Sequence, residues 1–152
     1  MAVFQLVATC LFGLEKLLGA EIDALGLRRT DTMDGRVSFV GNEIDIARAN
    51  INLRTAERVY IRLGSFEAKT FDQLFEATRA LPWEQFIGIR DCFPVKGHAI
   101  KSTLFSVPDC QKIVKKAIVR RLSDKYGVSW FEETGKKYQV EFFIFKDTAS
   151  LM

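Results

Sequence analysis

The side chains with the clearest chemical potential lie between Gly97 and Leu122, in the segment GHAIKSTLFSVPDCQKIVKKAIVRRL. This segment holds six lysines and arginines and one acid, Asp109, whereas the whole chain holds 22 basic and 19 acidic residues. The remainder therefore has 16 basic and 18 acidic residues, so the positive charge is local. Lys and Arg contacts to phosphates supply affinity without reading base sequence, so the segment predicts a polyanionic ligand. From charge alone, that ligand could be nucleic acid, an acidic protein or a membrane surface.

Most of these cations fall on a predicted helix from about residue 107 to 126. At 100° per residue its apolar side chains share one arc, formed by Cys110, Ile113, Val114, Ala117, Ile118 and Leu122. Across from this arc lie Lys112, Lys115 and Lys116, with Arg120 at the flank. Arg121 falls inside the apolar arc, so we expect its side chain to extend past the core edge or the helix to bend away. No acid lies between Asp109 and Asp124 to pair with the cations, which favours a ligand-binding face over an ordinary solvated one.

Polar residues just before the helix extend this basic region. Cations and hydroxyls surround Gly97, whose missing side chain would let a ligand approach the backbone; they are Lys96, His98, Lys101, Ser102 and Thr103. His98 has no Cys, Ser or carboxylate beside it in a recognisable arrangement, so we interpret it as a phosphate or solvent contact. Ser106 and Asp109 predict a capping box at the start of the helix.

Motifs for catalysis are missing from the chain. It has no GxxxxGK[ST], GxGxxG or GxSxG motif, and its ten glycines are isolated. Its three cysteines, Cys10, Cys92 and Cys110, form no CxxC pair, and there is one histidine. We therefore assign no catalytic residue and no metal site, and interpret the cysteines as core residues of a cytoplasmic protein. No segment approaches the roughly 20 apolar residues that span a bilayer, so no membrane partner is expected.

The first part of the chain predicts the elements of a ferredoxin-like subdomain over residues 1–66. A strand over residues 3–8 is followed by a helix that ends near Gly26, and Asp34-Gly35 is typical of a hairpin turn. A second helix from about 42 to 55 is expected to bury Ile44, Ala47 and Ile51, and ERVYIRLG alternates like a strand. The predicted order is β-α-β-β-α-β.

The second part, residues 67–152, has a different pattern. KTFDQLFEATRAL predicts a helix, PWEQFI a short helix, and CFPVKGHAIKS a strand that is bent or at a sheet edge because of Pro94 and Gly97. After the long helix, KYQVEFFIFKDTASLM predicts a strand, a turn and the opening of another strand. Because unpaired edge strands are a liability, we expect this last strand to belong to a truncated chain. The fold class is α+β.

Several stretches resemble a known family. KTFDQLFEATRALPWEQFI, FPVKGHAIKSTLFSVPDCQKIVKKAIVRRL and YQVEFFIFKD resemble a THUMP domain, an RNA-binding module of RNA-modifying enzymes. GLEKLLGAEIDALG, GRVSFVG and ANINLRTAERVYIRLGSFEAKTFDQLFE are similar to the N-terminal region of bacterial THUMP-containing guanine-N2 RNA methyltransferases of the ribosomal large-subunit type. The resemblance covers essentially the whole chain.

This resemblance implies that the chain binds structured RNA, ribosomal or transfer, for a catalytic domain that follows it. In the family that domain is Rossmann-like, binds S-adenosylmethionine and carries an Asn/Asp-Pro-Pro-Phe/Tyr motif, which this chain lacks. The RNA-binding residues implied jointly by resemblance and charge are Lys96, His98, Lys101, Ser102, Lys112, Lys115, Lys116 and Arg120. The same two blocks also occur in tRNA thiouridine synthetases, and a stand-alone protein-interaction domain is a third interpretation.

Overall fold

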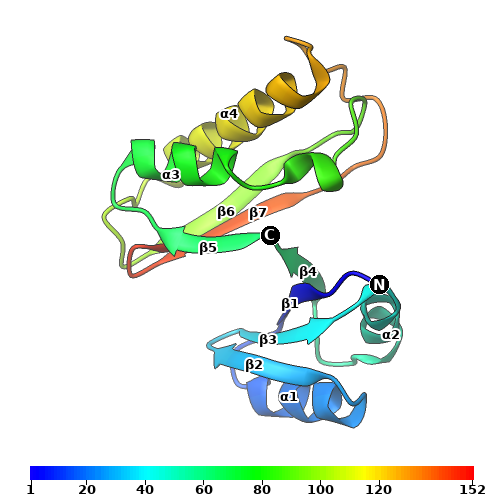
Figure 1. The fold of residues 1–152 in the computed structure, drawn as a ribbon. Coiled ribbons are helices and arrows are strands. Elements are labelled where there is room, and N and C mark those ends of the chain that lie inside the picture. The colour runs from blue at the N-terminus through cyan, green and yellow to red at the C-terminus, as the bar shows by residue number, and fades with distance from the viewer. The chain divides into compact units, whose positions relative to one another are not determined.

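The computed structural model describes residues 1–152 and confirms the α+β class. The chain divides into two compact units, Met1–Arg62 and Leu63–Met152, each with its own sheet and its own hydrophobic core (Figure 1). None of the helices combines the length and apolar character needed to cross a bilayer.

The first unit has the predicted β-α-β-β-α-β order. Its elements are β1 (Phe4–Thr9), α1 (Glu15–Ala24), β2 (Arg28–Met33), β3 (Arg36–Gly41), α2 (Glu43–Asn52) and β4 (Arg58–Arg62). The antiparallel sheet has the order β2-β3-β1-β4, and Leu6 and Phe39 project from it into a core shared with Ile22 of α1. Gly35 has a φ of 79° in the β2–β3 hairpin, which confirms the turn predicted at Asp34-Gly35.

Helix α2 buries a different face from the one predicted. Ile44, Ala47 and Ile51 are exposed, whereas Ala49 is buried and Ile46 packs against the core beside it. Asn42 caps the helix by accepting from the Asp45 backbone N–H at 3.0 Å, and so fixes its start at Glu43. The sequence offers two apolar stripes at helical spacing, and only docking on the sheet selects between them.

The second unit packs two helices on one face of a four-stranded sheet (Figure 1). Its elements are β5 (Gly64–Glu67), α3 (Phe71–Arg79), a short 3₁₀ turn η1 (Trp83–Gln85), β6 (Val95–Ile100), α4 (Val107–Tyr126), β7 (Val140–Phe145) and β8 (Thr148–Leu151). The sheet order is β5-β8-β7-β6, in which only β6 and β7 run parallel. Strand β6 is thus at an edge, as predicted. Because β5 pairs with β8, the compact units divide at Arg62/Leu63 rather than at residue 66.

The last strand is not an unpaired edge. Strand β8 lies between β5 and β7 and pairs with both, and Met152 exchanges two backbone hydrogen bonds with Glu141. Strand β8 is therefore not the unpaired edge on which the expected truncation was based. Its second partner, β5, comes from a segment more than 80 residues earlier, which local sequence patterns do not reveal.

Candidate nucleic-acid interface

Helix α4 begins differently from the prediction. The Ser106 hydroxyl donates to the Asp109 carboxylate at 2.6 Å, so it makes no cap bond to a backbone N–H. Its hydroxyl proton finds a charged acceptor one turn away, which is a stronger partner than a neutral group. The helix ends at Gly127, which has a φ of 68° and donates its N–H to the carbonyl of Ser123. The predicted capping box at Ser106 and Asp109 is thus replaced by a side-chain pair.

The buried face of α4 follows the predicted apolar arc. Five of its six members are fully buried, namely Cys110, Val114, Ala117, Ile118 and Leu122, while Ile113 is half-buried against the same core. Burial raises the pKa of the Cys110 thiol, which keeps it protonated. Cys10 is also buried, as expected of a core residue, and Cys92 is half-buried.

Three cations line the outer side of α4. Lys112, Lys116 and Arg120 are exposed, are spaced four residues apart, and make no ion pair with any acid. Four residues correspond to a rise of about 6 Å along a helix, so the three charges form a row roughly 12 Å long. We call these three residues the solvent stripe. They offer a row of donors without a competing carboxylate.

Lys115, which was predicted to join this face, is engaged inside the fold. Its Nζ lies 2.8 Å from Oε1 of Glu133, donates to the carbonyl of Phe93 at 2.9 Å, and sits 3.6 Å from the centre of the Phe93 ring. The hydrogen bond from Lys115 lowers the pKa of the Glu133 carboxyl. Lys115 therefore fastens the loop that contains Glu133 to α4, and its charge is already matched.

Arg121 reaches beyond the core edge, as one of the two predicted alternatives required. Its guanidinium donates two hydrogen bonds to Glu84 of η1, at 2.9 and 2.7 Å, and Lys125 lies 3.9 Å from the same carboxylate. The hydrogen bonds from Arg121 lower the pKa of Glu84 to about 2. No sequence signal pointed to Glu84 or Glu133, because each lies 18 or more residues from its cationic partner.

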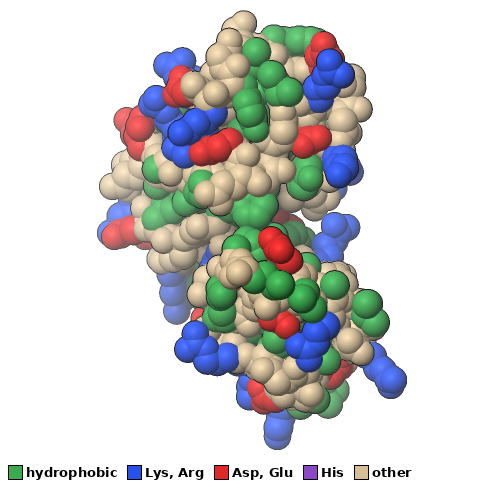
Figure 2. All heavy atoms as spheres, turned by 45° about the vertical axis from the view of Figure 1, so that its right-hand side comes forward, with side chains coloured by type: hydrophobic (Ala, Val, Ile, Leu, Met, Phe, Trp, Pro, Cys, Tyr) green, Lys and Arg blue, Asp and Glu red, His purple; other side chains and the backbone are tan.

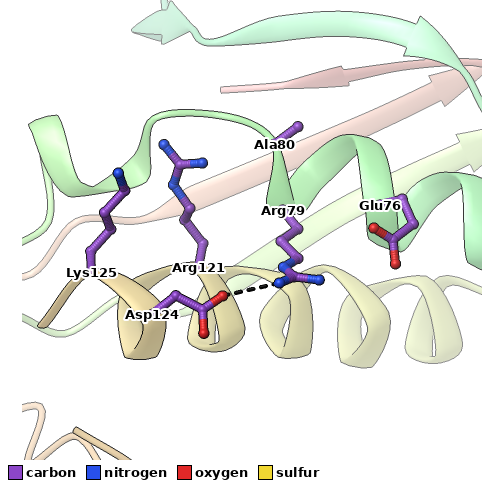
Figure 3. A pocket seen from close by; sticks show the side chains of 6 residues that line it. All are labelled: Glu76, Arg79, Ala80, Arg121, Asp124 and Lys125. Carbon is purple, nitrogen blue, oxygen red and sulfur yellow. Dashed lines mark hydrogen bonds and ion pairs between the residues drawn. The ribbon is translucent and has the colours of Figure 1, made fainter. Parts of the chain in front are cut away.

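Ion pairs also occupy a pocket of about 260 Å³ between α3 and α4. Its walls are Glu76, Arg79, Ala80, Arg121, Asp124 and Lys125 (Figure 3). Arg79 donates to Asp124 at 3.1 Å across the pocket, and Arg121 is bound to Glu84. Because acids largely neutralise its cations, the pocket is a poor site for a phosphate. The ion pair between Arg79 and Asp124 instead links α3 to α4.

The side chains of β6 that were predicted to contact a ligand point away from α4. Val95 and Ala99 face the core, so Lys96 and His98 project from the opposite face of the sheet, where both are exposed. Gly97 lies inside the strand, where an added Cβ would collide with the carbonyl oxygen and ring of Phe142. The expectation that Gly97 lets a ligand approach is wrong, because close packing of β6 on β7 already uses that space.

Residues Lys101 and Ser102 lie in the loop between β6 and α4. The Ser102 hydroxyl donates to the carbonyl of Ile100 at 2.9 Å and accepts from the Asp147 N–H at 3.1 Å. Asp147 also accepts from the Thr103 N–H at 2.7 Å, which lowers the pKa of its carboxyl. These bonds tie the loop to the β7–β8 turn, while the Lys101 side chain remains exposed.

The eight predicted contacts thus lie on separate surfaces. Lys112, Lys116 and Arg120 form one row, Lys101 and Ser102 lie in a loop, Lys96 and His98 face the other way, and Lys115 is in an ion pair. On the face shown in Figure 2, Lys and Arg side chains likewise stand in small groups, several beside Asp or Glu. The solvent stripe is the most coherent candidate for contact with a polyanion.

The chain's own residues do not fit a metal or a nucleotide cofactor. No three His, Cys, Asp or Glu side chains gather to hold a metal ion. The one parallel crossover, β6-α4-β7, has the arrangement that binds nucleotides in other folds, but its loop between Ile100 and Val107 contains no glycine. A cofactor site of that kind is therefore not built here.

Comparisons with known proteins agree on the two-part organisation. A family described as the RlmL ferredoxin-like domain matches residues 5–60, and the THUMP domain family matches residues 68–152. A putative RNA methyltransferase, YpsC of Bacillus subtilis, is 47% identical over 98% of this chain and 39% of its own length. The chain thus spans about two fifths of that relative.

Solved structures of longer proteins show the same fold. A predicted N6-adenine-specific DNA methylase from Listeria monocytogenes is 51% identical with a TM-score of 0.94, over 99% of this chain and 40% of that one. The methyltransferase SMU.472, described as putative and complexed with SAH, is 38% identical with a TM-score of 0.92. The match covers 100% of this chain and 41% of that one.

More distant relatives include RNA-modifying proteins of two kinds. A ribosomal RNA large subunit methyltransferase K/L from Cellvibrio japonicus is 32% identical over 83% of this chain and 17% of its own length. A 4-thiouridine synthetase in complex with RNA is 10% identical, with a TM-score of 0.59 over 98% of this chain and 40% of that one, and so shares the fold alone.

Proposed function

The chain belongs to the THUMP-domain family, and from that membership we propose that it is the RNA-binding part of an S-adenosylmethionine-dependent RNA methyltransferase. The observation that carries the proposal is the solvent stripe on α4, a row of three exposed cations without acid partners in a domain of this family. Phosphates of structured RNA are ligands that such a row would bind.

Methyl transfer itself belongs to a further domain in this proposal. The matched relatives named as methyltransferases or methylases extend well beyond the share that this chain covers. S-adenosylmethionine, when bound by that domain, would supply the methyl group. The residues of this chain bind and orient the RNA, and none of them has a role in the chemical step.

The RNA is, in the finer form of the proposal, large-subunit ribosomal RNA, and the modified atom is the N2 of a guanine. Support for the ribosomal target comes from the match to the RlmL ferredoxin-like domain and from the relatives named large subunit methyltransferase K/L. The guanine N2 is what the sequence resemblance implies. With ribosomal RNA as its substrate, the protein would act in the cytoplasm under this proposal.

The test is the salt dependence of RNA binding by the triple variant K112E/K116E/R120E. We expect its affinity for a folded large-subunit ribosomal RNA fragment to fall strongly at low salt. The slope of log K against log salt should become shallower by roughly 0.7–0.9 for each lost phosphate contact. An unchanged slope would show that the solvent stripe does not bind RNA.

Lys125→Glu is the matched control for the single variant Lys116→Glu, because each reverses one charge on the same helix. Lys125 lies outside the solvent stripe, beside Glu84 and the pocket between α3 and α4. Its variant should bind RNA with nearly the unchanged slope. An equal loss in Lys116→Glu and Lys125→Glu would mean that only overall charge matters. A chain that folds but shows no salt-sensitive binding to any RNA would favour a protein-interaction domain.

A thiouridine synthetase remains the second candidate, on fold alone. The downstream coding sequence separates the two, since a Pro-Pro methylase motif supports the proposal and a phosphate loop contradicts it.

A further inference from the structure

A second exposed patch lies at the opposite end of β6 from the Lys101 loop. Two loops, residues 88–92 and 128–139, come together there through backbone hydrogen bonds. The Gly135 N–H donates to the backbone carbonyl of Arg90 at 2.6 Å. The Cys92 N–H donates to the carbonyl of Lys136 at 2.8 Å, and the Tyr138 N–H to the carbonyl of Cys92 at 2.8 Å. Their exposed side chains form what we call the Trp130 patch, consisting of Ile89, Arg90, Trp130, Lys136, Lys137 and Tyr138.

Trp130 is the largest exposed side chain of the patch, and the residue that follows it is anchored in the core. Trp130 is 73% exposed, whereas the chain's other tryptophan, Trp83, is 2% exposed and donates its Nε1–H to Thr78. Phe131 is buried and packs edge-on against Phe93, with ring centres 5.9 Å apart. This packing fixes the backbone beside Trp130, so stacking a ligand on the indole orders the side chain alone. The flat ring therefore extends from an anchored segment.

The cations of the patch have no acid partners, although acids lie nearby in the sequence. Arg90, Lys136 and Lys137 make no ion pair. The Asp91 carboxylate instead accepts from the backbone N–H groups of Gly88 at 2.7 Å and Lys136 at 3.1 Å. Glu133 is paired with Lys115, which leaves Glu132 as the exposed acid of these loops. The fold thus engages two of the three carboxylates and leaves all three cations available.

We infer that the Trp130 patch binds an unpaired stretch of RNA, with one base stacked on Trp130 and the adjoining phosphates at Arg90, Lys136 and Lys137. Every base has a flat face, and exposed aromatic rings beside cations bind single strands by stacking and charge together. A protein partner would need a wide apolar surface here, whereas the exposed side chains of these two loops include three cations without acid partners. The inference rests on the proposed function, because it gives the RNA a single-stranded part beside the structured part at the solvent stripe.

The chain carries its own probe for this contact. Trp83 is buried in the core, so changes in tryptophan emission on adding RNA report mainly on Trp130. We expect oligouridylate to quench this emission and a blunt-ended RNA duplex to quench it far less. Titration of the protein with the buffer of each RNA, without the RNA, gives the baseline emission.

Three variants test the assignment through affinity for oligouridylate. Trp130→Ala should weaken binding roughly 5- to 150-fold, the equivalent of the loss of one stacked base at about 1–3 kcal/mol. Trp130→Phe keeps a ring and should retain most of the affinity. Phe12→Ala removes a ring that is 83% exposed in the first unit and should change nothing. The double variant K136E/K137E should make the salt slope shallower by roughly 0.7 for each lost contact to a single strand.

The outcomes separate this inference from the proposed function. Salt-sensitive binding of folded RNA that depends on the solvent stripe, with no quenching by oligouridylate and no effect of Trp130→Ala, would overturn the inference alone and favour a protein partner at the patch. Absence of binding to every RNA would overturn both. Quenching of equal size by single strand and duplex would also overturn the inference, because a duplex offers no free base face.

Discussion

Two sets of residues within Gly97–Leu122, the segment predicted to bind a polyanion, have different roles. The solvent stripe, Lys112, Lys116 and Arg120, faces outward without an acid partner. The packed set, which we define as Gly97, Lys115 and Arg121, is held in contacts with Phe142, Glu133 and Glu84 respectively. Comparison of Lys115 with Lys112 and Lys116 shows that a cation's role is decided by whether the fold brings a carboxylate to it, since these three lysines share the predicted face of one helix.

The largest expected effect concerns the packed set at Gly97. Gly97→Val would force a branched side chain against the backbone and ring of Phe142, so β6 must move away from β7. We expect the free energy of unfolding to fall by about 3 kcal/mol, at the upper end of the cost of overpacking. Urea denaturation measures it. A variant as stable as the parent would return Gly97 to the group of residues available for a ligand.

The next effect is a pH dependence at Glu84. Hydrogen bonds from Arg121 lower its pKa from 4.5 to about 2, so the ionised carboxylate stabilises the folded state. This stabilisation is fully present above about pH 5 and disappears as the pH falls toward 2. Glu84→Gln should therefore lower the free energy of unfolding by about 2 kcal/mol at pH 7, allowing for partial solvent screening, and by almost nothing near pH 2.

Urea denaturation of the parent protein and of Glu84→Gln between pH 2 and pH 7 measures the free energy of unfolding of each. Other carboxyls with lowered pKa values, such as Glu133 and Asp147, give the variant a residual acid sensitivity. The difference between the two curves isolates Glu84. A difference that stays constant with pH would contradict the ion pair with Arg121.

Lys115 should show a smaller effect on stability and little on RNA affinity. Lys115→Ala removes the ion pair with Glu133, the bond to the Phe93 carbonyl and the contact with its ring. Because both side chains are about one third exposed, we expect a loss of about 1–2 kcal/mol. Thermal denaturation and RNA titration of the same sample check it. Lys112→Ala is the control, since Lys112 has no ion-pair partner. A larger loss of RNA affinity in Lys115→Ala than in Lys112→Ala would show that Lys115 binds RNA and Lys112 does not.

The smallest effect on stability belongs to the solvent stripe. Lys116→Gln should change the free energy of unfolding by less than about 0.5 kcal/mol, because the residue is exposed and unpaired. The same variant should bind folded RNA a few-fold more weakly and with a slope shallower by roughly 0.7–0.9. The comparison would fail if Lys116→Gln destabilised the fold as much as Lys115→Ala.

Much of the fold could be predicted from local patterns. The β-α-β-β-α-β order, the Asp34-Gly35 hairpin and the buried arc of α4 are set by neighbours within a few residues of each other. The face of α2 and the pairing of β8 could not be predicted in this way. Both depend on which distant surface offers a partner, namely the sheet beneath α2 and strand β5.

The sequence by itself determined that one helix has an apolar side and a cationic side, because helical periodicity is a local property of the chain. It also carried the resemblance that the THUMP match confirms. Only the tertiary structure decided which cations remain available. Glu84 and Glu133 lie 37 and 18 residues from Arg121 and Lys115, and their carboxylates reach these side chains only when the strands, loops and helices pack together. Charge pairing at such separation depends on distance in space, which the order of residues does not specify.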